Sequence, residues 1–313
     1  MKISSTIGLQ KYSASQCNIG RLEVLRARAM GFCFGVRDAL AATRAETDPA
    51  AVTTLGELVH NAEVNAELTA RGFRRLDGPG EAAAVRTSAA LVTAHGASLR
   101  QFERLRAAGL RVIDTTCPLV RRVQQAAANF VADRRFLIVV GVPGHAEVAG
   151  VVGDFAEETY VVVRNAAAVR RWPHDRLGVV QQSTTDPDTA AATSAAIRAA
   201  NPRADVAVAE TICQPTRDRQ AAVRELCDTL KKRAPSPTVA VVGGRNSHNT
   251  ARLAALCDAE GVRAIRVCAA DELNAAAFRE LTVVGLTAGT STPDAVIDAV
   301  EQRLHSFPAG RSL

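Results

Sequence analysis

The chain has 313 residues, 47% of them hydrophobic but only 4% aromatic, and its formal net charge at pH 7 is +6. The charge comes from scattered arginines rather than a basic block with interleaved aromatics, so we expect no nucleic-acid binding. No apolar run is long enough to cross a bilayer, and the polar residues 1–20 lack the apolar stretch of a signal peptide, so we expect a cytoplasmic protein without membrane association.

Short apolar strands alternate with amphipathic helices along the chain. The predicted strands cover residues 23–29, 90–93, 112–114, 136–140, 160–163, 177–180, 206–209, 239–242 and 283–286. Helices are predicted at 118–132, 216–232 and 249–259, and in the first of these Val123, Ala127 and Phe130 fall on one face. This alternation predicts parallel sheets joined by crossover helices.

Three cysteines follow predicted strands and precede predicted helices, at about even spacing. They are Cys33 in Gly-Phe-Cys-Phe-Gly, Cys117 in Thr-Thr-Cys-Pro-Leu and Cys213 in Thr-Ile-Cys-Gln-Pro. The positive end of a helix dipole lowers the pKa of a thiol placed there, so we expect thiolates at these positions. Three thiolate ligands would leave one position of a metal centre open for substrate, which is typical of a catalytic iron–sulfur site.

The same units predict three α/β lobes with mainly parallel sheets around a common centre. We place the first lobe at residues 30–116, the second at 117–212 and the third at 213–313, after a disordered N-terminal extension at 1–21. The carboxyl ends of parallel strands are where ligands bind, and all three cysteines follow such ends.

The other cysteines and two of the histidines are given no chemical role. Seven cysteines in a chain without secretory features favour a reducing compartment over a disulfide framework. Cys227, Cys257 and Cys268 are expected to be structural, as is Cys17 in the polar tail. His174 and His305 lie in charged segments that we expect to be exposed, and they are given no role.

Several further strand ends carry glycine together with histidine, hydroxyl or amide side chains. Glycine permits close backbone approach, and hydroxyls and amides at helix N-termini bind anions, so these loops predict a phosphate or diphosphate pocket. The candidate ligands are His60, His95, His145, Ser183, Thr184, Ser247, His248, Asn249 and Ser291. Taken singly, each loop has a simpler explanation, because Ser, Thr and Asn before a helix are usually N-caps.

Glu147 follows His145 by two residues and has two possible roles. It is either a surface carboxylate or, beside a metal and a histidine, a proton relay. The chain has neither a Walker A sequence nor a G-x-G-x-x-G motif, so we expect no nucleoside triphosphate and no bound NAD or flavin.

These residues lie in segments that resemble those of one known family, the 4-hydroxy-3-methylbut-2-enyl diphosphate reductases, also called IspH or LytB. The resemblance runs from about residue 25 to about residue 304. The matching segments are Gly-Phe-Cys-Phe-Gly-Val at 31–36, Leu-Val-His-Asn at 58–61, Ala-His-Gly at 94–96, Thr-Cys-Pro-Leu-Val at 116–120, Gly-His-Ala-Glu-Val at 144–148, Thr-Ile-Cys at 211–213, Asn-Ser-His-Asn at 246–249 and Gly-Leu-Thr-Ala-Gly-Thr-Ser-Thr-Pro at 285–293.

The resemblance implies a cofactor, a fold and partners. Cys33, Cys117 and Cys213 would hold one 4Fe-4S cluster per subunit, with the substrate hydroxyl on its fourth iron and Glu147 as proton relay. Three α/β domains would surround the cluster with pseudo-threefold symmetry, and the strand at 22–29 would join the third. The expected partners are an allylic diphosphate substrate and an external electron donor such as ferredoxin or flavodoxin, and the expected state is a monomer.

Four departures from the family pattern are visible, and one of them is Gly150-Val151 before Val152-Gly153 in place of the common Gly-Thr before Met-Gly. Ser183 stands where the family usually has Thr, His248 stands where it often has Ser, and the N-terminal extension is longer than usual. Ser183 keeps the hydroxyl with a looser rotamer, whereas His248 either contacts phosphate or faces away.

The expected activity is reductive dehydroxylation of 4-hydroxy-3-methylbut-2-enyl diphosphate to isopentenyl and dimethylallyl diphosphate, the last step of the methylerythritol phosphate route to isoprenoids. One alternative is an iron–sulfur sensor or regulator, for which Glu147 would be dispensable. Another is a paralogue that acts on a different allylic diphosphate. A structural zinc protein would need close ligand pairs such as C-x-x-C, and these are absent from the sequence.

Overall fold

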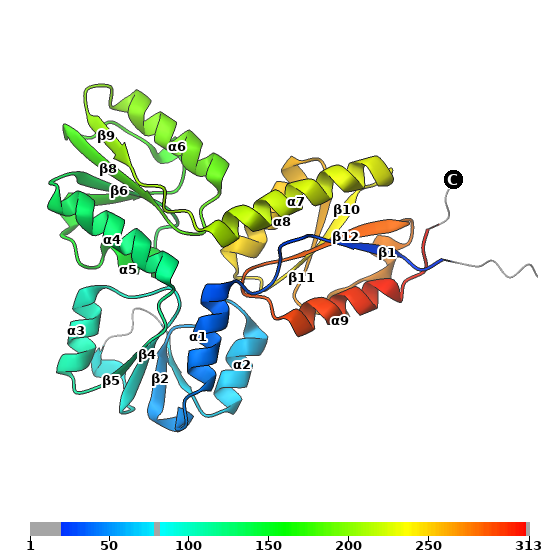
Figure 1. The fold of residues 1–313 in the computed structure, drawn as a ribbon, viewed down its shortest axis with the longest axis horizontal. Coiled ribbons are helices and arrows are strands. Elements are labelled where there is room, and N and C mark those ends of the chain that lie inside the picture. The colour runs from blue at the N-terminus through cyan, green and yellow to red at the C-terminus, as the bar shows by residue number, and fades with distance from the viewer. Residues whose placement is uncertain (1–19, 78–81, 311–313) are drawn as a thin grey trace, which may run out of the picture.

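Three four-stranded parallel sheets surround one junction in the computed structural model, which describes residues 20–77 and 82–310 (Figure 1). The first sheet has the strand order β3-β2-β4-β5, the second β7-β6-β8-β9 and the third β11-β10-β12-β1. In chain order the strands are β1 (Glu23–Arg26), β2 (Val52–Leu55), β3 (Arg74–Leu76), β4 (Ala89–Val92), β5 (Arg111–Asp114), β6 (Phe136–Val140), β7 (Tyr160–Val163), β8 (Arg176–Gln181), β9 (Asp205–Val208), β10 (Thr238–Val242), β11 (Arg263–Val267) and β12 (Val283–Ala288).

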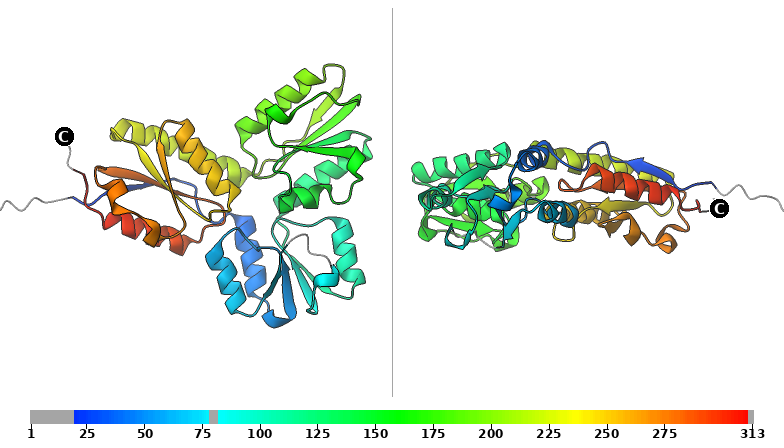
Figure 2. Two further views of the ribbon diagram at one scale, coloured as in Figure 1. Left: turned by 180° about the vertical axis from the view of Figure 1, so that it is seen from behind. Right: turned by 90° about the horizontal axis from the view of Figure 1, so that it is seen from below.

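Helices cover both faces of each sheet. They are α1 (Phe34–Arg44), α2 (Ala62–Ala70), α3 (Leu99–Ala107), α4 (Pro118–Ala132), α5 (Ala146–Val152), α6 (Pro187–Ala200), α7 (Gln214–Arg233), α8 (His248–Ala259) and α9 (Asp294–His305). The lobes lie in one flat layer when the molecule is seen from the side (Figure 2). Every sheet therefore has two apolar cores, one on each face.

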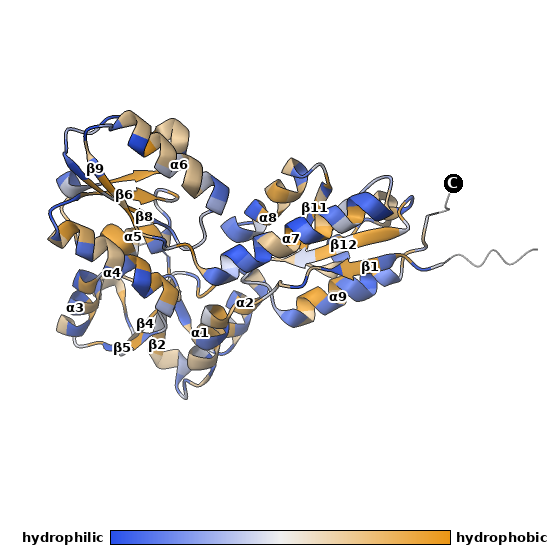
Figure 3. Ribbon diagram, turned by 45° about the horizontal axis from the view of Figure 1, so that its top comes forward, coloured by the Kyte–Doolittle hydropathy of each residue, from blue (hydrophilic) through white to orange (hydrophobic). Residues whose placement is uncertain are grey.

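The strands are apolar because both of their faces are buried. In β6 the sequence Phe-Leu-Ile-Val-Val leaves Leu137 and Val139 in one core and Ile138 and Val140 in the other. Figure 3 shows hydrophobic strands inside the lobes and polar residues on the outer faces of the helices. Continuous apolar runs of this kind are typical of parallel sheets, since helices cover both faces.

The three sheets share one topology, and the third is completed by the start of the chain. In the first two sheets the strands follow the order second-first-third-fourth, and β11, β10 and β12 repeat the first three of these positions. The fourth position is occupied by β1, which pairs in parallel with β12 from Glu23↔Val283 to Arg26↔Leu286. The fold is thus a threefold repeat whose last strand comes first in the chain.

Backbone hydrogen bonds at the strand ends repeat in the same way. After the first strand of each unit, a glycine amide donates to the last residue of the second strand. The bonds run from Gly56 to Leu76 (2.8 Å), from Gly141 to Val163 (2.9 Å) and from Gly243 to Val267 (2.9 Å). These bonds direct three equivalent loops toward the junction.

The predicted three-lobed α/β fold with parallel sheets is confirmed, but three strands were missed. These are β2, β3 and β11. The lobe boundaries at 116/117 and 212/213 stay a prediction. Residues 1–19, which include Cys17 and nearly all of the predicted extension, lie outside the described residues. No helix in the described part of the chain combines the length and apolarity needed to cross a membrane.

Candidate functional site

The three predicted cluster cysteines occupy equivalent places in the threefold repeat. Cys33, Cys117 and Cys213 follow β1, β5 and β9, the fourth strand of each sheet, and form the N-caps of α1, α4 and α7. None of their side chains caps its helix, and all three are free thiols. They line one cavity at the junction, together with the candidate diphosphate ligands and Glu147.

Close contacts link the cysteine loops. A Cβ added to Gly35 would lie 2.5 Å from Sγ of Cys117, so the start of α1 packs directly on the Cys117 thiol. The Cys213 thiol donates a hydrogen bond to Oγ1 of Thr216 at 3.1 Å. Thr216 is fully buried and lines the same cavity.

The predicted fall in thiol pKa is wrong for two of the three cysteines. Burial raises the pKa of the Cys117 thiol, and it raises the pKa of the Cys213 thiol to about 11, although hydrogen bonding with Thr216 opposes this shift. Desolvation of the thiolate therefore outweighs the favourable helix terminus in the metal-free chain. Metal binding would have to displace these protons, as it does at other thiolate sites.

Replacing Gly35 by Ala is expected to lower iron incorporation while leaving the ligand-free fold intact. The added Cβ would displace Sγ of Cys117, which can turn away when it has no ligand but is held in place by a metal centre. The iron content per chain after anaerobic reconstitution measures the loss of loading. Circular dichroism of the unloaded protein checks that the fold is intact. Full iron loading of the variant would contradict this expectation.

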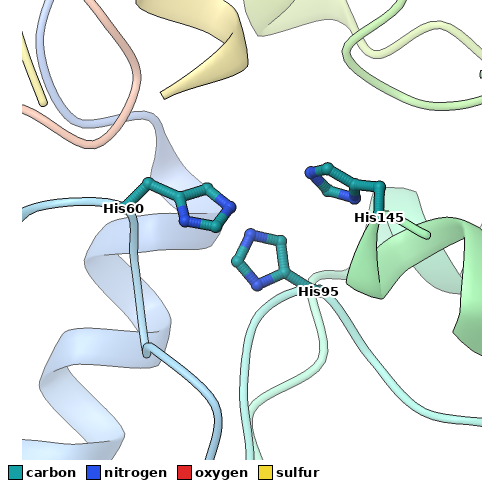
Figure 4. Close-up of side chains that lie close together, drawn as sticks. All are labelled: His60, His95 and His145. Carbon is teal, nitrogen blue, oxygen red and sulfur yellow. The ribbon is translucent and has the colours of Figure 1, made fainter. Parts of the chain in front are cut away.

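Three histidines form a cluster beside the cysteines. The ring centroids of His60 and His95 are 4.8 Å apart, those of His95 and His145 5.4 Å, and those of His60 and His145 5.9 Å (Figure 4). His60 follows β2 and His145 follows β6, so these two rings occupy equivalent repeat positions. One ring nitrogen from each histidine lies within 4.8 Å of the others, which is close enough to bind one metal ion or one small anion.

The hydrogen bond behind the His145 ring favours an anion. Nδ1 of His145 accepts from the backbone N–H of Glu147 at 3.1 Å, which leaves the proton of the neutral ring on Nε2. Such a ring presents a donor rather than a lone pair, and a donor suits phosphate oxygen better than a cation. Nδ1 of His60 bonds to the carboxylate of Glu57 at 3.0 Å, and its Nε2 is buried without a partner among the described residues.

The surroundings of three of the histidine rings lower their pKa values. Burial, together with the neighbouring histidines, lowers the pKa of His95 to about 3 and that of His145 to about 4. The pKa of His248 is lowered as well, first by burial and then by the charges of His60 and Arg164. In the ligand-free chain these three rings are therefore neutral at pH 7.

The N-terminus of α8 forms the opposite wall of the cavity. Ser247 caps the helix through its hydroxyl, which accepts from the N–H of Thr250 at 3.2 Å. His248 faces the cavity, with its ring centroid 5.5 Å from that of His145, so it does not face away. Nδ2 of Asn249 is buried without a hydrogen-bond partner among the described residues. Ser291 follows β12 and completes this wall.

Glu147 is buried rather than exposed. It is 2% accessible, and its carboxylate accepts from the N–H of Ser183 at 2.6 Å and from the Ser183 hydroxyl at 2.8 Å. Burial raises the pKa of Glu147 to about 7, although both bonds from Ser183 oppose the shift. Thr184, by contrast, accepts from the side-chain amide of Gln182 at 3.1 Å. The surface interpretation of Glu147 is therefore wrong.

All of the candidate site residues line the same cavity. Three residues with functional contacts were missed: Glu57 behind His60, Thr216 beside Cys213, and Arg219 behind the Cys33 loop. The spacing Cys-x-x-Thr resembles a helix-capping pattern and could have indicated Thr216. Nothing in the sequence separates Arg219 from the many surface arginines.

The chain is similar to known proteins over most of its length. A family model described as LytB protein matches residues 24–305. The 4-hydroxy-3-methylbut-2-enyl diphosphate reductase of Anaeromyxobacter sp. (strain K) is 34% identical over 91% of this chain and 100% of its own length. That of Geobacter metallireducens is 30% identical over 93% and 100%.

Two solved structures share the fold. The structure of the E-1-hydroxy-2-methyl-but-2-enyl-4-diphosphate reductase from Plasmodium falciparum superposes with a TM-score of 0.80 at 22% identity, covering 90% of this chain and 87% of that one. A second structure, of (E)-4-hydroxy-3-methyl-but-2-enyl diphosphate reductase, superposes with a TM-score of 0.63 at 29% identity, covering 91% and 100%.

Proposed function

This chain belongs to the LytB protein family, and from that premise we propose that it reduces 4-hydroxy-3-methylbut-2-enyl diphosphate to isopentenyl and dimethylallyl diphosphate. This would be the last step of the methylerythritol phosphate route to isoprenoids. One observation carries the proposal: three free cysteines, a buried carboxylate and a group of neutral, partly unpaired donors line one cavity.

The donor set fits an iron–sulfur centre. Cys33, Cys117 and Cys213 are free thiols, and they reach the cavity from three separate lobes, where three irons of a 4Fe-4S cluster could bind. When bound, such a cluster would supply electrons and one iron without a protein ligand, which can act as a Lewis acid toward the substrate hydroxyl.

The diphosphate would bind in the half of the cavity that contains the histidines. His145 offers an Nε2–H, Asn249 offers an unpaired amide N–H, and the N-terminus of α8 favours negative charge. His60 lines the same cavity, and its buried Nε2 has no partner among the described residues. Further ligands proposed for the diphosphate are His95, Ser247, His248 and Ser291.

Glu147 would supply protons for the reaction. Two electrons and two protons convert the allylic alcohol into an alkene and water, so one proton must reach the leaving hydroxyl. A buried carboxyl with a pKa of about 7 is about half protonated at neutral pH and can both donate and regain that proton. Ser183 holds both of its oxygens, and we propose that Ser183 relays the proton while Thr184 borders the path.

The electrons must come from outside the chain. We propose a low-potential one-electron protein such as ferredoxin or flavodoxin as donor, and we propose that the protein acts in the cytoplasm as a monomer. Anaerobic reconstitution tests the cofactor directly: about four irons and four sulfides per chain would support a 4Fe-4S cluster. A chain that retains no iron would contradict the proposed site.

Asn249 allows a test of diphosphate binding that is independent of the cluster. Replacing Asn249 by Leu is expected to weaken binding of inorganic diphosphate about 10–100-fold, since a hydrogen bond to a charged group contributes about 1.5–3 kcal/mol. The ligand-free variant should unfold at the same temperature as the wild type or above it, because a buried donor without a partner is removed. Calorimetric titration and thermal unfolding give the two values.

Asn65 provides the matched control. It is also buried, but its Nδ2 donates to the carbonyl of Val59 at 3.0 Å. Replacing Asn65 by Leu should therefore lower the unfolding temperature. Unchanged diphosphate affinity in the Asn249 variant would contradict the assigned pocket.

A further inference from the structure

Arg219 lies in α7, the helix that begins after Cys213, and its guanidinium is buried. The side chain is only 6% accessible. Nε and Nη2 donate to the carbonyl of Gly31 at 3.2 and 2.6 Å, and Nη1 donates to the carbonyl of Pro215 at 3.0 Å. Gly31 precedes Cys33 by two residues, and Pro215 lies one turn before Arg219 in α7, so the guanidinium ties the helix that begins after Cys213 to the loop that carries Cys33.

No carboxylate forms an ion pair with Arg219 in the described part of the chain. Its hydrogen-bond acceptors are neutral carbonyls, and Asp218 acts on it only as a nearby charge. Arg135, another largely buried arginine, pairs with both Asp133 and Asp205. Burying an unpaired cation is costly, so a site that retains one predicts an anion nearby.

The candidates for that anion are Cys33 and Cys213. The charges that would most raise the pKa of Arg219, against the lowering by burial, are those of Cys33 and Cys213. Both residues would be thiolates when they hold metal. The buried cation therefore lies against the loop that carries Cys33, beside the place where negative charge would accumulate on loading.

We propose that Arg219 is the buried counter-ion of the metal centre held by the three cysteines and that its positive charge raises the reduction potential of this centre. The inference rests on the proposed function, because it requires an iron–sulfur centre at these cysteines. Reduction adds one electron from the donor and breaks no bond, so the centre becomes more negative. A fixed cation stabilises the reduced form more than the oxidised form. Arg219 is thus a positioning residue that also sets a potential.

The experiment is an anaerobic redox titration of the loaded protein, with dithionite as reductant and the electron paramagnetic resonance signal of the reduced cluster as readout. At the wild-type midpoint potential, Arg219→Met should show a reduced-to-oxidised ratio at least about tenfold lower, equivalent to about 59 mV for one electron. Arg219→Lys keeps the charge but loses the two-point bond to Gly31, and its ratio should stay within about threefold of the wild type.

Arg217→Met is the matched control. Arg217 lies on the same helix but pairs with Glu210 near the surface, so its loss should leave the potential unchanged. If Arg219→Met folds without taking up iron while Arg219→Lys loads normally, the charge requirement is supported. Equal midpoints for the wild type and Arg219→Met would overturn the proposal. So would an Arg219→Lys variant that behaves like Arg219→Met, since hydrogen bonding alone would then explain the residue. A wild-type chain that takes up no iron would instead refute the proposed function.

Discussion

Replacing Glu147 by Gln is expected to lower turnover about 10²–10⁴-fold, the usual contribution of a positioned proton donor. Gln keeps the size of the side chain and can still bond to Ser183, so the fold and the cysteine loops should be unaffected. Iron and sulfide content should therefore match the wild type. Steady-state assays with a chemical reductant, together with iron analysis, separate loss of chemistry from loss of the cofactor.

The pH profile gives a second test of Glu147. Its protonated form is the donor, and its pKa is raised to about 7 by burial, so wild-type kcat should fall as pH rises through about 7. The Gln variant should lack this transition. Glu157→Gln, which alters an exposed carboxylate of the same lobe, should leave both rate and profile unchanged. Normal turnover by the Glu147 variant would refute the proton-relay role.

Replacing Cys213 by Ser is expected to abolish reductive turnover and most iron loading. A serine hydroxyl is a poorer iron ligand than a thiolate, and the remaining two cysteines cannot hold three irons. The chain should still fold, because the Cys213 side chain makes no cap hydrogen bond to α7. Iron and sulfide per chain and the visible absorbance of the cluster measure the loss.

Cys227 is a matched control on the same helix. It is fully buried, but it lies in an apolar core beside Cys257 and away from the cavity. Cys227→Ser should therefore lower the unfolding temperature without changing iron content. Equal iron loss in both variants would indicate a general effect of cysteine replacement and would contradict a specific role for Cys213.

The central strands of the fold could be predicted where their sequences are apolar, as in β6 and β10. The three missed strands could not be predicted, because their sequences are more polar. β2 reads Val-Thr-Thr-Leu and is buried, but Thr53 bonds to the Thr87 hydroxyl and Thr54 to the carbonyl of Arg74, so its polarity conceals a central strand. β3 and β11 are edge strands that carry exposed arginines.

The positions of the cysteines and histidines could be predicted because parallel strands bring their carboxyl ends together. The contacts between segments that are far apart in the chain could not be predicted, because they depend on packing that no local sequence pattern encodes. Arg219 shows this, because it bonds to the carbonyl of Gly31, 188 residues away in the chain. Glu57 and Thr216 instead bond to His60 and Cys213, each three residues away, so their contacts are local. The thiol pKa values were misjudged for a related reason: the helix terminus is a local feature, whereas burial is a property of the whole junction.

The measurement that tests the central claim most directly is anaerobic turnover of 4-hydroxy-3-methylbut-2-enyl diphosphate by the iron-loaded wild-type chain, with a chemical reductant and product identification. The proposed function predicts isopentenyl and dimethylallyl diphosphate as products and no reaction by the Cys213 variant. A fully loaded chain that binds diphosphate but releases neither product would contradict the reductase assignment.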